Sequence, residues 1–226
     1  MGAPRAVEIA RGLYAIVADA PASRYNQNVI ERHLTDLDWV SRAAVAHEAV
    51  VEHFIDARAV LPMKLFTIFS NDDRAVAHLQ RERLRLSVAA RRVAGQHEWG
   101  VRVLLDSSRA VAEPKASSVR AKSGASYLQA KKARRDAVEE LAMRARRTAA
   151  GVYERLAKNA RAARKRTSRD LPSGQGTLLL DAAFLVARTR QTAFRAVAAK
   201  EAKALAAKGY AITLTGPWPP YTFVQD

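Results

Sequence analysis

The stretch TLLLDAAFLV, residues 177–186, is unusually apolar for its length. Within it only Thr177 and Asp181 have polar side chains. It follows RTSRDLPSGQG at 166–176, which is rich in turn-forming residues. A short apolar run bounded by turn residues is typical of a strand that is buried on both faces. We therefore predict a fully buried β-strand at this point of the chain.

A helix and a strand are predicted on the C-terminal side of this run. The helix spans about Gln191 to Ala207 and is followed by Lys208 and Gly209, a cation and then glycine, as is common at helix C-termini. Residues 212–215, ITLT, alternate apolar and polar side chains, which predicts a strand.

A long basic helix is predicted on the N-terminal side, over about residues 126–166, with a break near Gly151. Apolar residues recur in it at helical spacing and form a narrow stripe: Val138, Leu141, Ala145, Ala149, Val152 and Leu156. Residues 107–123 are rich in Ser, Ala and Lys without a clear period, so we expect an interdomain linker there. The second half of the chain thus follows the order α-β-α-β.

The first 106 residues predict a β-α-β-α-β unit. Capping-box patterns at Thr35 and Asp38, and at Ser70 and Asp73, predict where its two helices begin. Apolar spacing then continues the second of these as one helix as far as Val93. Strands are expected over LYAIVAD (13–19), VLPMKLFTIF (60–69) and HEWGVRVLLD (97–106). We therefore expect an α+β protein with two domains, residues 1–106 and residues 107–226.

Positive charge is concentrated in one segment. The 226 residues contain 38 Lys+Arg and 22 Asp+Glu, a net charge of +16. Residues 1–106 contain 14 Lys+Arg and 13 Asp+Glu, residues 107–170 contain 18 Lys+Arg and 6 Asp+Glu, and residues 171–226 contain 6 Lys+Arg and 3 Asp+Glu. An electrostatic partner is therefore expected to contact the middle segment.

Several kinds of chemical site are excluded. With no cysteine, the chain has no disulfide, thiolate metal site or cysteine nucleophile. His47 and His53 of HEAVVEH are six residues apart, about 120° around a helix, so they do not face one metal ion. SGQG at 173–176 precedes a strand, whereas a phosphate-binding loop precedes a helix. We expect no catalytic, cofactor-binding or metal-binding residues, no small-molecule substrate and no enzyme activity.

No stretch approaches the roughly 20 apolar residues of a membrane span. Leu13–Ala18 is the best candidate and is too short, and the charged Arg11 and Asp19 on either side exclude a signal-peptide core. We therefore expect a cytoplasmic soluble protein without a membrane partner.

The basic segment has three interpretations. Nucleic-acid binding through residues 115–169 would use Lys and Arg to neutralise phosphates, but only Tyr127 and Tyr153 are available there for base stacking. A solvated helix face and docking to an acidic protein surface are together favoured over nucleic acid, and both stay open. The candidate partner-binding residues are Lys131, Arg134, Arg135, Arg144, Arg147, Arg155, Arg161 and Arg164.

The C-terminal tail, GPWPPYTFVQD at 216–226, combines prolines with aromatic residues. Pro217, Pro219 and Pro220 predict an extended, polyproline-like path. Trp218, Tyr221 and Phe223 are expected to fold back as anchors, since burying each contributes roughly 2–3 kcal/mol. We favour this packing role over partner binding.

LTGPWPPYTFV at 214–224 resembles the C-terminal signature of the gas vesicle protein GvpL/GvpF family. Other stretches resemble the family in the same order: LYAIV (13–17), DLDWV and AHEAVVEHF (36–54), VLPMKLFTIF (60–69), EWGVRVLLD (98–106), SGASYLQAKKARRDA (123–137) and LLLDAAFLVART (178–189). Phe66 departs from the pattern, because glycine is usual at its position. Residues 20–35 and 107–122 also depart from it.

The resemblance implies an accessory or minor structural protein of gas vesicle assembly. Gas vesicles are hollow protein shells built from a small, very apolar subunit, and family members are similar in being non-enzymatic helpers that contact this shell subunit and other accessory proteins. The implied fold has two α+β domains, of which the second is a modified ferredoxin-like domain. The implied location is the cytoplasm and the gas vesicle.

Overall fold

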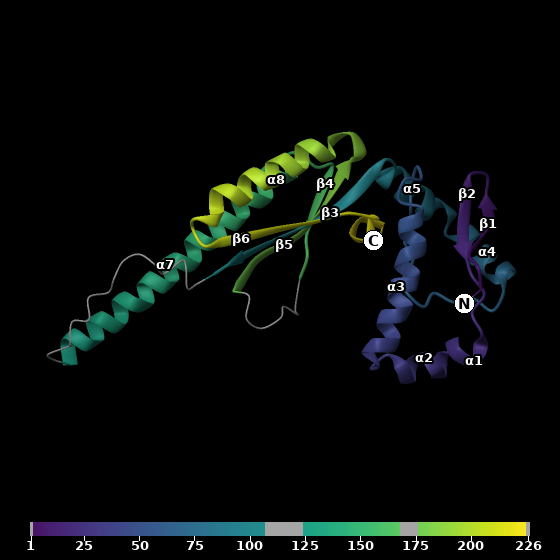
Figure 1. The fold of residues 1–226 in the computed structure, drawn as a ribbon, viewed down its shortest axis with the longest axis horizontal. Coiled ribbons are helices and arrows are strands. Elements are labelled where there is room, and N and C mark those ends of the chain that lie inside the picture. The colour runs from purple at the N-terminus through teal and green to yellow at the C-terminus, as the bar shows by residue number, and fades with distance from the viewer. Residues whose placement is uncertain (1, 107–123, 168–175, 225–226) are drawn as a thin grey trace. The chain divides into compact units, whose positions relative to one another are not determined.

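The computed structural model describes residues 2–106, 124–167 and 176–224. Its chain divides into two compact units. The first contains residues 1–96 together with 218–226, and the second contains residues 97–217. Both are mixed α/β, and each is described by itself (Figure 1).

The first unit is built on a two-stranded hairpin. β1 (Arg5–Ala10) pairs antiparallel with β2 (Leu13–Val17), and the turn between them contains Gly12 at a φ of 76°. β2 confirms the strand predicted from LYAIV, whereas β1 was not predicted. α4 (Asp72–Arg81) packs against β1, where Gln80 Nε2 donates to the Ile9 carbonyl at 3.1 Å.

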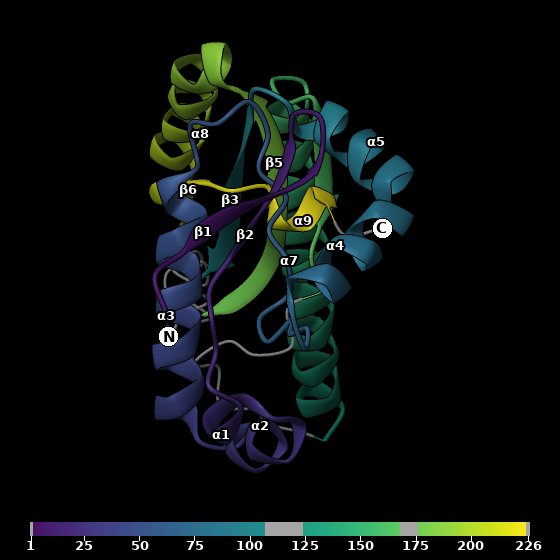
Figure 2. The ribbon, with the colours of Figure 1, turned by 90° about the vertical axis from the view of Figure 1, so that its right-hand side faces the viewer.

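Four further helices of the first unit precede residue 97. They are α1 (Ala22–Tyr25), α2 (Gln27–His33), α3 (Leu37–His53) and α5 (Arg83–Val93). α1 and α2 lie at the N-terminal end of α3 (Figures 1 and 2). The helix predicted to run on to Val93 is two helices, because α4 ends before Glu82 and α5 begins after it.

Both predicted capping boxes are displaced. α3 is capped by Asp36, whose carboxylate accepts from Trp39 N at 3.0 Å, and not by Thr35. α4 is capped by Asn71, which accepts from Arg74 N at 2.9 Å, and not by Ser70. In each case a short polar side chain one residue further along reaches the third residue of the helix, which is the geometry of an N-cap.

The strand predicted over residues 60–69 is wrong, because these residues form neither strand nor helix. The backbone turns where Thr67 N donates to the Lys64 carbonyl, and Phe66 has a φ of 62°. This left-handed conformation interrupts an extended strand and is the one that glycine adopts without strain. Glycine is usual at this position in the resembled family, and here the Phe66 ring stacks on Trp39 at 5.1 Å between centroids.

The second unit has the element order β-α-β-β-α-β. Its elements are β3 (Gln96–Leu105), α7 (Gly124–Ala157), β4 (Ala162–Lys165), β5 (Thr177–Ala187), α8 (Gln191–Ala206) and β6 (Tyr210–Trp218). The four strands form one sheet in the order β4-β5-β3-β6, with β4 and β5 antiparallel. The short 3-10 turn η1 (Arg188–Arg190) joins β5 to α8.

α7 and α8 cover the same face of this sheet (Figure 1). The core between the helices and the sheet contains Trp99, Val101 and Val103 of β3, Ala149, Val152 and Leu156 of α7, Leu180, Ala182, Phe184 and Val186 of β5, and Phe194 and Ala198 of α8. β5 and α8 confirm the buried strand and the helix predicted from the sequence. The long basic helix is shorter than predicted, because the chain turns after Ala157 and forms β4, and Gly151 does not break it.

These units have other bounds than the expected domains, residues 1–106 and 107–226. β3 lies in the sheet of the second unit, where its alternating apolar residues meet α7 and α8. The tail belongs to the first unit, because α9 (Tyr221–Val224) packs against α5. The expected linker, residues 107–123, lies outside the described residues.

Candidate partner-binding surface

The part of the chain that the structure describes contains no cluster of three or more His, Cys, Asp or Glu side chains placed to hold a metal ion. His47 Nε2 lies 3.2 Å from the Met63 carbonyl, and His53 packs edge-on against Phe54. In the same described regions, no helix is both long and apolar enough to cross a membrane.

The two halves of α7 lie in different environments. In the C-terminal half, Ala145, Ala149, Val152 and Leu156 are at most 2% exposed and pack against the sheet. In the N-terminal half, every residue from 127 to 140 is exposed. This half extends past the end of the sheet (Figure 1). We call residues 127–140 the overhang.

One face of the overhang continues the core-facing stripe of α7. Tyr127, Lys131, Arg134 and Val138 follow at helical spacing and are in line with Ala145. Because no strand of the described sheet lies beneath them, Tyr127 and Val138 are 59% and 60% exposed. Val138 belongs to the predicted apolar stripe of α7, but it lies outside the core. Here the stripe is an exposed surface in which two cations lie between two apolar side chains.

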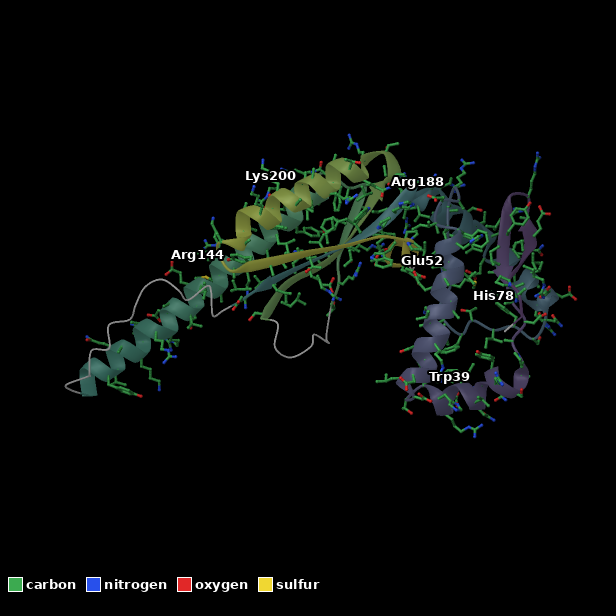
Figure 3. The ribbon with its side chains drawn as sticks, in the orientation of Figure 1. Trp39, Glu52, His78, Arg144, Arg188 and Lys200 are labelled. Atoms are coloured by element: carbon green, nitrogen blue, oxygen red, sulfur yellow. The ribbon has the colours of Figure 1, made fainter. Side chains whose placement is uncertain are left out.

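The cations of the overhang differ in their pairing. Arg135 lies 3.7 Å from Glu139 and 3.8 Å from Asp136, distances that give weak, exposed ion pairs. Within the described regions, Lys131 and Arg134 have no ion-pair partner, so their charge is available to another molecule. Just beyond the overhang, Arg144 donates to Glu140 at 3.1 Å, and its position on α7 is visible in Figure 3.

The other candidate cations lie outside the overhang. Arg155 donates to both carboxylate oxygens of Glu201 on α8, at 2.5 and 2.8 Å, and this hydrogen bonding raises the pKa of its guanidinium. Arg155 thus joins two helices and is not free for a partner. Arg147 is exposed on α7, Arg161 is exposed before β4, and Arg164 is half-buried within β4. The structure therefore brings together only Lys131, Arg134 and Arg135 of the predicted set.

Two ion pairs with buried carboxylates join β3, β5 and the residue that follows β4. Arg102 donates to Asp181 at 3.2 Å, and Arg166 donates to Glu98 at 2.9 Å. Both carboxylates are at most 5% exposed, so their arginine partners offset the cost of removing them from water. Asp181 interrupts the apolar run at 177–186 for this reason. The sequence did not indicate this pairing, because the four residues are far apart along the chain.

The tail packs within the first unit. Phe223 and Pro219 are fully buried, Pro220 is buried and Tyr221 is half-buried. The Tyr221 hydroxyl donates to Glu48 of α3, and Arg92 of α5 donates to the Phe223 carbonyl at 3.4 Å. Trp218 is 39% exposed and Pro217 is exposed. In place of a polyproline-like path, the chain runs through the end of β6 into the short helix α9.

Comparison with known proteins identifies the family. The family model "Gas vesicle synthesis protein GvpL/GvpF" matches residues 2–225. The chain belongs to the GvpL/GvpF family. One member, gas vesicle protein L of Streptomyces sp. (strain CB03234), is 30% identical over 215 residues, which are 93% of this chain and 79% of that protein.

Two GvpF crystal structures have the same fold. GvpF from Anabaena sp. PCC7120 gives a TM-score of 0.67 at 17% identity and covers 99% of this chain and 88% of its own. GvpF from Microcystis aeruginosa gives a TM-score of 0.62 at 14% identity, and the match covers 99% of this chain and 89% of that one. The GvpL/GvpF family takes part in gas vesicle formation and is not a known enzyme class. The chain is therefore a gas vesicle protein with a mixed α/β fold.

Proposed function

We propose that this chain is a non-enzymatic accessory or minor structural protein of gas vesicle assembly that binds the apolar shell subunit and other gas vesicle accessory proteins. Its place of action is the cytoplasm and the growing vesicle. The observation that carries the proposal beyond family membership is the overhang, because a helix of fourteen exposed residues contributes nothing visible to the core of its own unit.

The physical need for such a protein follows from the shell subunit. A small, very apolar subunit exposes large apolar patches before it is built into the shell, and such patches drive aggregation. A protein that covers them transiently keeps the subunit available for polymerisation. The role is thus chaperone-like or nucleating, and it needs reversible binding instead of catalysis.

The face of the overhang that carries Lys131 and Arg134 suits an acidic protein partner. Lys131 and Arg134 supply positive charge that no described carboxylate pairs with, while Tyr127 and Val138 supply apolar contact area on the same face. Complementary charge accelerates encounter and selects the partner, and apolar contacts then add affinity. Nucleic acid is less well suited, because Tyr127 is the only aromatic residue of the overhang.

We also propose that the second unit is a modified ferredoxin-like domain. Its support is the β-α-β-β-α-β order together with two helices on one face of a four-stranded sheet. In this arrangement the C-terminal half of α7 and α8 together cover the sheet, so the overhang is left for a partner.

Co-purification tests the proposed function. The full chain, immobilised, is mixed with purified shell subunit and, separately, with each other gas vesicle protein of the same host. We expect capture of the shell subunit and of at least one acidic accessory protein. Capture of none of them would contradict the proposal.

Charge variants locate the acidic partner on the overhang. Lys131→Glu combined with Arg134→Glu is expected to weaken its binding by about tenfold. The matched control is Lys200→Glu with Lys203→Glu, which makes the same charge change at two exposed positions of α8. Lys200 is labelled in Figure 3. Equal losses in both variants would show that only net charge matters. Binding of duplex DNA that persists at about 0.15 M salt would favour a nucleic-acid function instead.

A further inference from the structure

The two edges of the four-stranded sheet are built differently. β4 forms one edge, is only four residues long, and includes or adjoins Arg161, Arg164 and Lys165. β6 forms the other edge, is nine residues long, and has no charged residue from Tyr210 to Trp218. Short length and positive charge are the usual means by which an edge strand avoids pairing with another chain. The β4 edge is therefore protected, whereas β6 from Tyr210 to Thr215 has no charged residue and no proline, Pro217 lying near its end.

The register of β6 shows which of its backbone groups face outward. Asp106 N donates to the Gly209 carbonyl at 2.9 Å, and a Cβ on Gly100 would lie 2.6 Å from Thr215 Oγ1, so both observations fit one antiparallel register with β3. In an antiparallel strand, the backbone N–H and C=O groups of successive residues point alternately toward one neighbouring strand and away from it. In this register the amides of Ala211 and Thr213 face β3. Those of Ile212 and Leu214 face outward. Within the described sheet, no strand lies on that outer side.

The side chains along β6 are suited to an added strand. Ile212 and Leu214 are half-buried against the helix-covered core, where they extend an apolar surface to the sheet edge. Ala211 and Thr213 are exposed and small, so they leave room for the side chains of a neighbouring strand. An extended segment with alternating apolar residues would pair with the backbone and continue the core.

We propose that the outer edge of β6 binds an extended, uncharged and alternately apolar segment of the shell subunit by strand addition. This inference rests on the proposed function for the identity of the partner. A second copy of this chain is disfavoured as the occupant. Residues 97–217 carry 25 Lys+Arg against 10 Asp+Glu, so pairing β6 with β6 would bring together two units of charge +15.

A lysine placed on the edge tests the proposal. Ala211→Lys is expected to weaken binding of purified shell subunit to the immobilised full chain by about tenfold, equivalent to about 1.4 kcal/mol. Ala204→Lys is the matched control, because it makes the same change at an exposed position of α8. Thr213→Lys repeats the test on β6, and thermal melts check that each variant folds.

Amide hydrogen exchange supplies a measurement that needs no variant. The shell subunit should slow exchange at Ile212 and Leu214, while the amides of Ala211 and Thr213 are already protected by β3 in the free chain. Salt should change this protection little, whereas binding at the overhang should weaken as salt rises.

Each outcome has a distinct meaning. If the shell subunit binds the Ala211→Lys and Ala204→Lys variants equally well and leaves exchange at Ile212 and Leu214 unchanged, strand addition is wrong and the proposed function stands. If the unaltered chain captures no shell subunit, the proposed partner itself is wrong. A concentration-dependent dimer that Ala211→Lys abolishes would identify a second copy as the occupant and overturn the proposal.

Discussion

At the scale of single residues, Phe66 combines an unfavourable backbone with a favourable side chain. Its φ of 62° lies in the left-handed region, which costs a residue with a side chain about 1–2 kcal/mol. Its ring stacks on Trp39 of α3 at 5.1 Å between centroids. The sequence pattern predicted a strand here because residues 60–69 are rich in apolar and β-branched residues. Such a pattern does not reveal that one residue has a positive φ.

Replacing Phe66 by two small residues separates these contributions. Phe66→Ala and Phe66→Gly both remove the ring, but only glycine also relieves the backbone strain. We expect the glycine variant to have the higher free energy of unfolding, by about 1 kcal/mol, measured by urea denaturation. Because alanine is normally the more stabilising of the two, an advantage for alanine would contradict the assigned conformation.

The tail residues offer a second comparison at this scale. Phe223 is 1% exposed, and its loss leaves a cavity, so Phe223→Ala should lower the free energy of unfolding by about 3–5 kcal/mol. Trp218 is 39% exposed, and Trp218→Ala should cost clearly less although it removes a larger side chain. Thermal melts of both variants check this order. Equal destabilisation would show that the tail does not anchor through Phe223.

At the scale of elements, α7 is one helix with two roles. Leu156 is fully buried between α7 and the sheet, whereas Leu128 in the overhang is 65% exposed. We expect Leu156→Ala to lower the free energy of unfolding by about 2–5 kcal/mol. Leu128→Ala, the same substitution on the same helix, should change it by less than about 0.5 kcal/mol. A large loss from Leu128→Ala in denaturation experiments would show that the overhang is part of the core.

Sequence patterns predicted the elements that are set by local signals. β5 was predicted from the apolar run at 177–186, because a strand buried on both faces needs apolar residues throughout. α8 was predicted to end near Lys208 and Gly209, because a cation and a glycine are typical of a helix C-terminus. β4 was missed, since AARK at 162–165 continues the basic composition of the helix before it. Only pairing with β5 makes it a strand. The β6 edge could not be predicted either, because strand order is a property of the sheet.

At the scale of the whole molecule, charge follows the division into units. Residues 97–217 carry +15 of the net +16, so the first unit with the tail is almost neutral. Both candidate partner surfaces belong to the charged unit: the Lys131 and Arg134 face of the overhang, and the uncharged β6 edge. The sequence placed the charge in residues 107–170 but could not separate the exposed cations from Arg155, which is engaged with Glu201.

The two surfaces should respond differently to salt. Raising the salt from about 0.05 M to about 0.5 M shortens the screening length severalfold, so binding of an acidic partner at the overhang should weaken. Strand addition at β6 uses backbone hydrogen bonds and apolar contacts, and binding of the shell subunit should change little. Titration of each purified partner at the two salt concentrations measures this, and the reverse pattern would contradict the assignment of surfaces.

The most direct test of the central claim, that this chain assists gas vesicle assembly, is to count vesicles after its removal. The gene is deleted in a vesicle-forming strain that carries no second member of the family, and cells are examined by electron microscopy. We predict few, absent or misshapen vesicles, with normal vesicles restored when the intact gene is returned. Vesicles of normal number and shape in the deletion strain would contradict the account.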